Sequence, residues 1–195
     1  MNATGYRLLE WLSFWMFRRR VLRDAGPGRG GVCAEIGVWK GDFSRRIIDF
    51  LTPKELHLID PWAFVPDLPN RWYGGAFARS QDDMDAIHRS VQERFSAEPA
   101  VRVHRGSSLD LATQFADGYF DWVYIDGDHS RQAVLCDLRA WHSKVRPGGL
   151  LVLDDYYWRD ESGQRSVKAA IDDFLGHTQV RQARSYAGQF VIQAA

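Results

Sequence analysis

Short apolar runs alternate with helical segments along most of the chain, and this alternation constrains the fold more than any other feature of the sequence. Alternation at this spacing is typical of βαβ units, so we expect an α/β fold with a mainly parallel, Rossmann-like, doubly wound sheet. The apolar character of the strands indicates that helices cover both faces of the sheet. The pattern predicts strands at 32–36, 56–60, 101–104, 122–126, 150–153, 179–181 and 189–192, and helices at 43–51, 82–95, 108–115, 130–145 and 166–175.

A Gly/Pro-rich cluster at 24–31 separates an N-terminal segment, residues 1–30, from the main domain at 31–195. Apolar residues at 8–17 recur with helical spacing, a length about half of what a membrane span needs. The stretch also lacks the flanks of a signal peptide. We expect an amphipathic helix that packs on the domain or on a second copy in a homodimer. A peripheral membrane helix and a lid over the site are the alternatives.

Charge and cysteine content narrow the class of protein further. The chain has 195 residues, with 25 Lys and Arg against 25 Asp and Glu, so its formal net charge is zero. Such a balance argues against a protein that coats nucleic acid. Cys33 and Cys136 are too few for a disulfide framework and indicate a reducing compartment, which we expect to be the cytoplasm.

Ligands of such sheets bind beyond the carboxyl ends of the strands, so the residues there matter most. Glu35, Gly37 and Gly41 follow the first strand, where glycines permit close approach to a nucleotide or simply form a tight turn. Asp60 ends the second strand and is placed to accept hydrogen bonds from ribose hydroxyls, unless it is only a solvated acid. Gly106 and Ser107 follow the third strand and either contact an adenine or cap the next helix.

Four carboxylates follow the fourth and fifth strands: Asp126, Asp128, Asp154 and Asp155. The two strands are one strand–helix–strand unit apart, so we expect these acids to meet in space. Clustered carboxylates repel one another, and the pattern shows no balancing cation. A divalent ion with oxygen ligands, Mg²⁺ or Mn²⁺, is the simplest relief. Helix capping by Asp128 and turn formation by Asp154 and Asp155 are the alternative.

These motifs resemble the class I S-adenosylmethionine-dependent methyltransferases from about residue 32 onward. The carriers are Glu35-x-Gly37-x-x-x-Gly41, Leu58-Ile59-Asp60, Ile125-Asp126-Gly127-Asp128-His129 and Pro147-Gly148-Gly149. Together with Asp154 and Asp155, they are similar to the small metal-dependent O-methyltransferases of methyltransferase family 24, which modify macrolide and aminocoumarin sugars. The resemblance implies a seven-stranded sheet with an antiparallel last strand.

The resemblance also implies roles for individual side chains. Cofactor contacts would come from Glu35, Gly37 and Gly41 at the methionine part, Asp60 at the ribose, Gly106 and Ser107 at the adenine, and Asp126. The metal ligands would be Asp126, Asp154 and Asp155. Asp128 would be the general base, and His129 is a second candidate base or a residue that orients a ligand.

We therefore expect metal-assisted O-methylation of a hydroxyl on a small molecule or sugar. Aromatic residues at 61–80 and 156–159 are candidates for the acceptor walls, with packing in the protein as the alternative. A nicotinamide dehydrogenase would need a G-x-G-x-x-G turn, which is missing. A nucleic-acid methyltransferase would carry Asn/Asp-Pro-Pro-Tyr/Phe in place of 126–129. A non-catalytic, membrane-associated relative is the third alternative.

Overall fold

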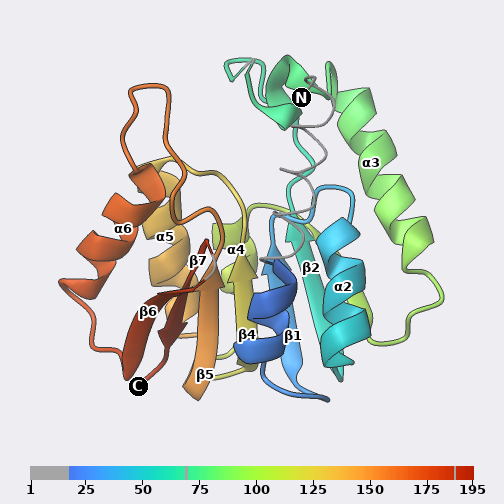
Figure 1. Cartoon of the computed structure of the whole chain (residues 1–195). Helices are drawn as coiled ribbons and strands as arrows, with labels where there is room; N and C mark the ends of the chain where they lie inside the picture. Colours follow the sequence, from blue (N-terminus) through green and yellow to red (C-terminus); the bar gives the residue numbers. More distant parts are fainter. Residues whose placement is uncertain (1–17, 69, 187) are drawn as a thin grey trace, which may run out of the picture.

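The computed structural model describes residues 18–68, 70–186 and 188–195 (Figure 1). The helix predicted at 8–17 lies outside these residues. The strands are β1 (Val32–Ile36), β2 (Glu55–Asp60), β3 (Val101–Arg105), β4 (Phe120–Ile125), β5 (Val145–Leu153), β6 (Gln182–Tyr186) and β7 (Gln189–Gln193). The helices are α2 (Asp42–Leu51), the π-helix η1 (Trp72–Ala76), α3 (Gln81–Arg94), α4 (Ser108–Ala112), α5 (Arg131–His142) and α6 (Ser166–Leu175), and residues 18–24 are also helical.

All seven strands form one sheet in the order β3-β2-β1-β4-β5-β7-β6. The pairs β1–β2, β2–β3, β1–β4 and β4–β5 are parallel, and β7 runs antiparallel to both of its neighbours. The predicted α/β fold is confirmed, including the antiparallel last strand. In this order β1 and β4 lie side by side although β2 and β3 separate them in the sequence, which makes the switch point where ligands of such sheets bind.

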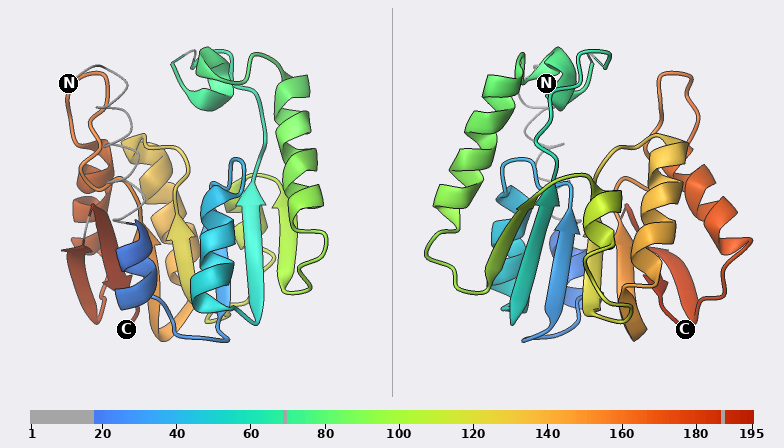
Figure 2. Two further views of the ribbon diagram at one scale, coloured as in Figure 1. Left: turned by 45° about the vertical axis from the view of Figure 1, so that its right-hand side comes forward. Right: turned by 180° about the vertical axis from the view of Figure 1, so that it is seen from behind.

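Helices cover both faces of the sheet (Figure 2). The helix at 18–24, α2 and α3 pack on one face, around Trp122 and Tyr124 of β4. On the other face α4, α5 and α6 pack around Val123 and Ile125. Alternate residues of β4 thus enter opposite cores, as the period of a strand requires.

The described end of the N-terminal segment is fixed to the sheet. Val21 and Leu22 are fully buried in the core beside Trp122, and the Trp122 indole N–H donates to the carbonyl of Ala25 over 2.8 Å. This bond satisfies the polar atom of a large buried side chain, which an apolar core alone could not do. No helix within the described ranges is long and apolar enough to cross a membrane.

Several predicted boundaries were wrong, and tertiary pairing explains the clearest case. The helix predicted at 130–145 ends at His142, because Val145 is buried and already pairs with Phe120 of β4. Strand β5 therefore begins five residues earlier than predicted and continues through Pro147-Gly148-Gly149. Apolar periodicity cannot separate a last helical turn from a first strand residue when both face the same core.

Candidate active site

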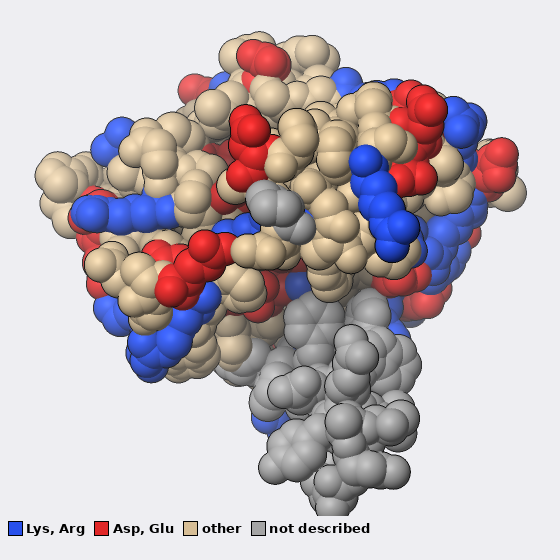
Figure 3. All heavy atoms as spheres, turned by 90° about the horizontal axis from the view of Figure 1, so that it is seen from above, with Lys and Arg blue, Asp and Glu red and all other residues tan. Residues whose placement is uncertain are grey.

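The carboxyl ends of the parallel strands meet at the upper edge of the sheet in Figure 1. Figure 3 looks onto this end and shows acidic and basic side chains interspersed over it. The residues predicted from the sequence to bind a cofactor, a metal or a proton follow β1, β2, β3, β4 and β5 at this same end. The fold therefore brings the predicted residues to one edge.

Gly37 lets the loop after β1 cross the end of β4. Its φ is +88°, and a Cβ built on it would lie 2.0 Å from the backbone oxygen of Asp126. The Asp126 N–H donates to the carbonyl of Ile36 over 2.7 Å, and the Gly37 N–H donates to Ile59 over 2.9 Å. The close approach therefore requires glycine, and it fixes the backbone of Asp126 against the loop.

Asp60 organises the same loop from the end of β2. One carboxylate oxygen accepts hydrogen bonds from the backbone N–H groups of Val38 and Trp39, each over 3.0 Å, and the other accepts from Trp62 over 2.7 Å. The side chain is buried, which raises its pKa above the usual range despite these bonds. The contact of Asp60 with a ribose remains a prediction. It would use the part of the carboxylate's accepting capacity that the three backbone N–H groups leave free.

Glu35 lies beneath this loop. It is buried in β1 and accepts a 2.5 Å hydrogen bond from the Ser44 hydroxyl of α2. Burial raises the pKa of Glu35 to about 8, against the opposing effect of the Ser44 bond. Glu35 therefore connects β1 to α2, and its predicted place beside the methionine part of a cofactor stays a prediction.

The two small residues after β3 have structural partners. The Gly106 N–H donates to the carbonyl of Asp60 over 3.1 Å, which holds the ends of β2 and β3 together. Ser107 is the N-cap of α4, and its hydroxyl oxygen accepts from the Asp110 N–H over 3.1 Å. The capping alternative is thus realised for Ser107, and an adenine contact remains a prediction.

Asp126, Asp154 and Asp155 meet as the sequence predicted, whereas Asp128 is bound by Ser130 and Tyr73 instead, and the expectation that no cation balances the acids was wrong. The Arg18 guanidinium lies 2.5 Å from Asp126 and forms a second ion pair with Asp154. Arg18 is only 7 % exposed, and it also lies over the rings of Phe43 and Tyr124. A cation from the N-terminal segment therefore neutralises part of the acid cluster.

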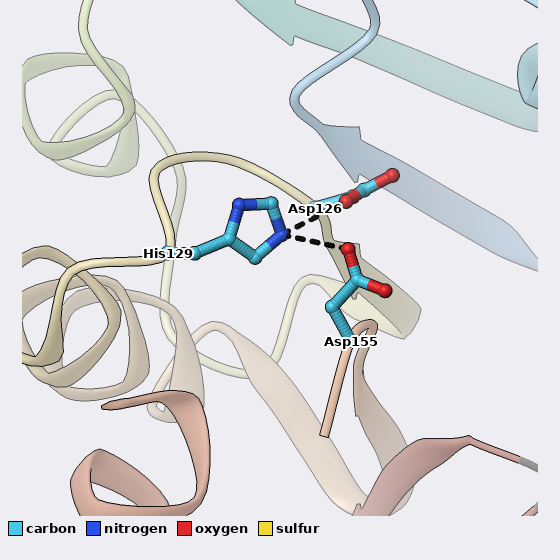
Figure 4. Close-up of side chains that lie close together, drawn as sticks. All are labelled: Asp126, His129 and Asp155. Carbon is cyan, nitrogen blue, oxygen red and sulfur yellow. Dashed lines mark ion pairs between the residues drawn. The ribbon is translucent and has the colours of Figure 1, made fainter. Parts of the chain in front are cut away.

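His129 joins Asp126 to Asp155 (Figure 4). Its Nε2 lies 3.0 Å from Asp155 Oδ2 and 3.6 Å from Asp126 Oδ1. Burial lowers the pKa of His129, but the two carboxylates outweigh it and raise that pKa to about 10. Within the described residues, Asp126, His129 and Asp155 are the group spaced to hold a metal ion, with one ligand atom each and all three atoms within 4.8 Å of one another.

Asp154 has a different environment from that of Asp155. Its carboxylate is 4 % exposed and accepts a 2.8 Å hydrogen bond from the Gln189 amide at the start of β7. Burial raises the pKa of Asp154 to about 6, although Arg18 opposes the shift. Asp155 has a φ of +53°, a left-handed conformation that Asp tolerates better than most residues and that occurs at functional sites.

Asp128 lies between the start of α5 and the loop at 61–80. Its Oδ1 accepts from the Ser130 N–H over 2.6 Å, in a turn that precedes α5. Its Oδ2 accepts a long bond, 3.4 Å, from the hydroxyl of Tyr73 in η1. Burial and the negative charge of Asp128 raise the pKa of Tyr73 to about 12, so Tyr73 remains a donor at neutral pH. The capping role is present, and one oxygen stays only weakly bound.

Aromatic side chains form two groups beside the candidate site, one around Trp39 and one around Trp158. Trp39 packs against Trp72 and Phe77, and the latter two are 62 % and 55 % exposed. In the second group Trp158 packs against the His129 ring. The Arg71 guanidinium lies over the Trp158 ring, 5.1 Å from its centroid. Sequence reasoning found these aromatic runs but not Arg18 or Gln189, since nothing local distinguishes Arg18 from Arg19 and Arg20.

The sheet order with an antiparallel β7 and the strand-end motifs define the fold of S-adenosylmethionine-dependent methyltransferases. The family model described as methyltransferase domain matches residues 34–156, so the chain belongs to the methyltransferase domain family. A search of curated protein sequences found no match.

Solved structures support the same fold at low sequence identity. The O-methyltransferase NovP is 20 % identical with a TM-score of 0.63, over 94 % of this chain and 80 % of that one. A protein from Corynebacterium glutamicum is 19 % identical with a TM-score of 0.62, over 100 % and 91 %. The MycE methyltransferase from the mycinamycin biosynthetic pathway, in complex with Mg and SAH, is 15 % identical with a TM-score of 0.55, over 92 % and 48 %.

Proposed function

We propose that the chain transfers the methyl group of S-adenosylmethionine to a hydroxyl oxygen of a small molecule or sugar, with assistance from a divalent metal. The observation that carries the proposal is the group Asp126, His129 and Asp155, which adjoins the loop after β1. The His129 nitrogen lies 3.0 Å and 3.6 Å from the two carboxylate oxygens, a separation that suits neighbouring ligands of an ion whose bonds to oxygen and nitrogen are about 2.0–2.2 Å long. The complex of MycE with Mg and SAH agrees with this assignment.

The residues around the loop after β1 would each contact a different part of the cofactor. The loop that contains Gly37 and Gly41 would lie beside its methionine part together with Glu35, Asp60 would face its ribose, and Gly106 with Ser107 would border its adenine. Asp126 connects the cofactor to the metal group, because its backbone is fixed to the β1 loop and its side chain faces His129. Such preorganisation places the sulfonium methyl beside the acceptor oxygen.

Asp128 removes the proton of the acceptor hydroxyl. A divalent ion at this group would supply a lowered pKa of that hydroxyl and a fixed orientation of the acceptor. The weakly bound Oδ2 of Asp128 accepts the proton, and the Tyr73 hydroxyl holds the carboxylate in place. The exposed Trp72 and Phe77 present flat apolar faces that suit a sugar ring or an aryl group.

Binding and turnover test the proposal separately. Isothermal titration with S-adenosylhomocysteine, with and without Mg²⁺ or Mn²⁺, tests the cofactor site. Turnover with a panel of sugar and catechol-type diols is expected to stop with EDTA and in Asp155→Ala, while S-adenosylhomocysteine still binds. Turnover that survives both treatments would contradict the assistance by a metal, and a lack of S-adenosylhomocysteine binding would contradict the methyltransferase activity itself.

A further inference from the structure

We infer that Arg18 is a built-in cation of the acid cluster, which occupies the Asp154 side of Asp126 and confines a divalent metal to Asp126, His129 and Asp155. The inference rests on the proposed metal-assisted function and changes the ligand set that the sequence predicted, because Asp154 becomes the partner of Arg18 and His129 takes its place. It divides a cluster of three aspartates into two adjacent sites that share Asp126.

The first step of the argument is that Arg18 is held in place. It lies in the described helical stretch 18–24, and Val21 and Leu22 of that stretch are fully buried on the sheet. The Trp122 indole fixes the end of the segment through the carbonyl of Ala25. The guanidinium itself lies against the rings of Phe43 and Tyr124, so it is anchored by packing as well as by charge.

The second step is that protein groups already use both oxygens of Asp154. The Gln189 amide donates to Oδ1, and Arg18 pairs with Oδ2. A carboxylate that is 4 % exposed and bound on both oxygens would have to lose these contacts before it could bind a metal. Asp154 is therefore placed as the counter-ion of Arg18.

The third step is that the opposite side of Asp126 faces His129 and Asp155, which pair with each other and not with Arg18. Arg18 lies on Oδ2 of Asp126, whereas His129 Nε2 lies nearest to Oδ1. His129 points at Asp155 and Asp126 (Figure 4). Two carboxylates and an imidazole that releases its proton to solvent would give a ligand set of charge −2, which matches one divalent ion. The imidazole favours Mn²⁺ and later transition metals over Mg²⁺.

A direct titration of the full chain with Mn²⁺, without methyl donor or acceptor, tests the inference. The matched pair is Asp154→Asn and Asp155→Asn, because both variants remove one negative charge from neighbouring positions. We expect the dissociation constant for Mn²⁺ to rise at least about tenfold more in Asp155→Asn than in Asp154→Asn, and His129→Ala to behave like Asp155→Asn. Circular dichroism and a melting curve without metal establish that each variant is folded.

Arg18→Gln tests the cation directly, with the exposed Arg19→Gln as its control. Removal of the unit positive charge beside Asp126 is expected to tighten Mn²⁺ binding by at least about tenfold, with no change in Arg19→Gln. If Arg18→Gln does not fold, the Asp154 and Asp155 pair still decides the ligand set.

The outcomes separate the inference from the proposed function. If Asp154→Asn loses Mn²⁺ as strongly as Asp155→Asn and His129→Ala retains it, the three-aspartate set is correct and the inference fails, while metal assistance stands. If the unaltered chain binds no divalent ion, both the inference and the metal assistance fail. The titration with S-adenosylhomocysteine then shows whether methyl transfer without a metal remains.

Discussion

Gly37→Ala is the substitution whose effect follows most directly from the structure. The left-handed φ of +88° costs an alanine about 1–2 kcal/mol. The new Cβ would also lie 2.0 Å from the carbonyl oxygen of Asp126, a distance that forces the backbone to move. Overpacking of this kind costs about 1–3 kcal/mol, so we expect the free energy of unfolding to fall by about 2–5 kcal/mol in total.

Gly28→Ala is the matched control for this substitution. Gly28 has a similar φ of +81°, but a Cβ built there meets no atom within 4 Å. It therefore carries the backbone cost alone, about 1–2 kcal/mol. Urea unfolding of both variants measures the two losses, and the difference between them isolates the contact with Asp126.

The same contact predicts a functional loss. Because Asp126 must retreat from the new methyl group, S-adenosylhomocysteine and Mn²⁺ should both bind more weakly to Gly37→Ala and unchanged to Gly28→Ala. Equal losses of stability in the two variants, or unchanged ligand binding by a folded Gly37→Ala, would refute the reasoning.

Three further predictions concern buried ionisable groups. Glu35 keeps its proton up to a pKa of about 8 when folded but loses it near 4.5 when unfolded, so its stabilisation is present below pH 4.5 and lost as the pH rises toward 8. Glu35→Gln should flatten that part of the stability profile in denaturant titrations from pH 5 to about 8. Burial and the neighbouring His104 and Arg102 lower the pKa of His57, and Glu55 opposes the shift. Because the unfolded chain then binds a proton more readily than the folded one, the free energy of unfolding should fall below about pH 6.5. The fall should be smaller in His57→Gln. Asp60→Asn leaves at least one of three backbone N–H groups without its acceptor and should cost about 1–3 kcal/mol in urea unfolding, whereas the exposed Asp67→Asn should change stability little.

The fold was largely predictable because its information is local and repetitive. Strands β1, β4 and β5 are built on short, mostly apolar runs, and the acids that follow β4 and β5 mark the carboxyl ends whatever the exact boundaries are. The meeting of Asp126 with Asp155 then follows from the topology alone. The boundary at Val145 was missed because only its pairing with Phe120 distinguishes it from the end of a helix.

The charge balance of the site was not predictable in the same way. Arg18 belongs to a run of three arginines, and its helix positions one of them over the sheet while Arg19 and Arg20 remain exposed. Gln189 is the first residue of an ordinary β-strand, and its bond to Asp154 depends on the antiparallel insertion of β7 beside β5. Both contacts join residues at least 35 positions apart, where no sequence period operates.

The position of Arg18 and Gln189 on either side of Asp154 has a consequence for how the chain is made. Arg18 leaves the ribosome early and Gln189 late. Asp154 therefore lacks its hydrogen bond from Gln189 until β7 has been synthesised. Until then the acids of the cluster are hydrated, because the nascent chain lacks the strand that covers Asp154. Completion of the ion network thus reports completion of the sheet, and a chain truncated before β7 should retain helices yet fail to mature into a binding-competent molecule.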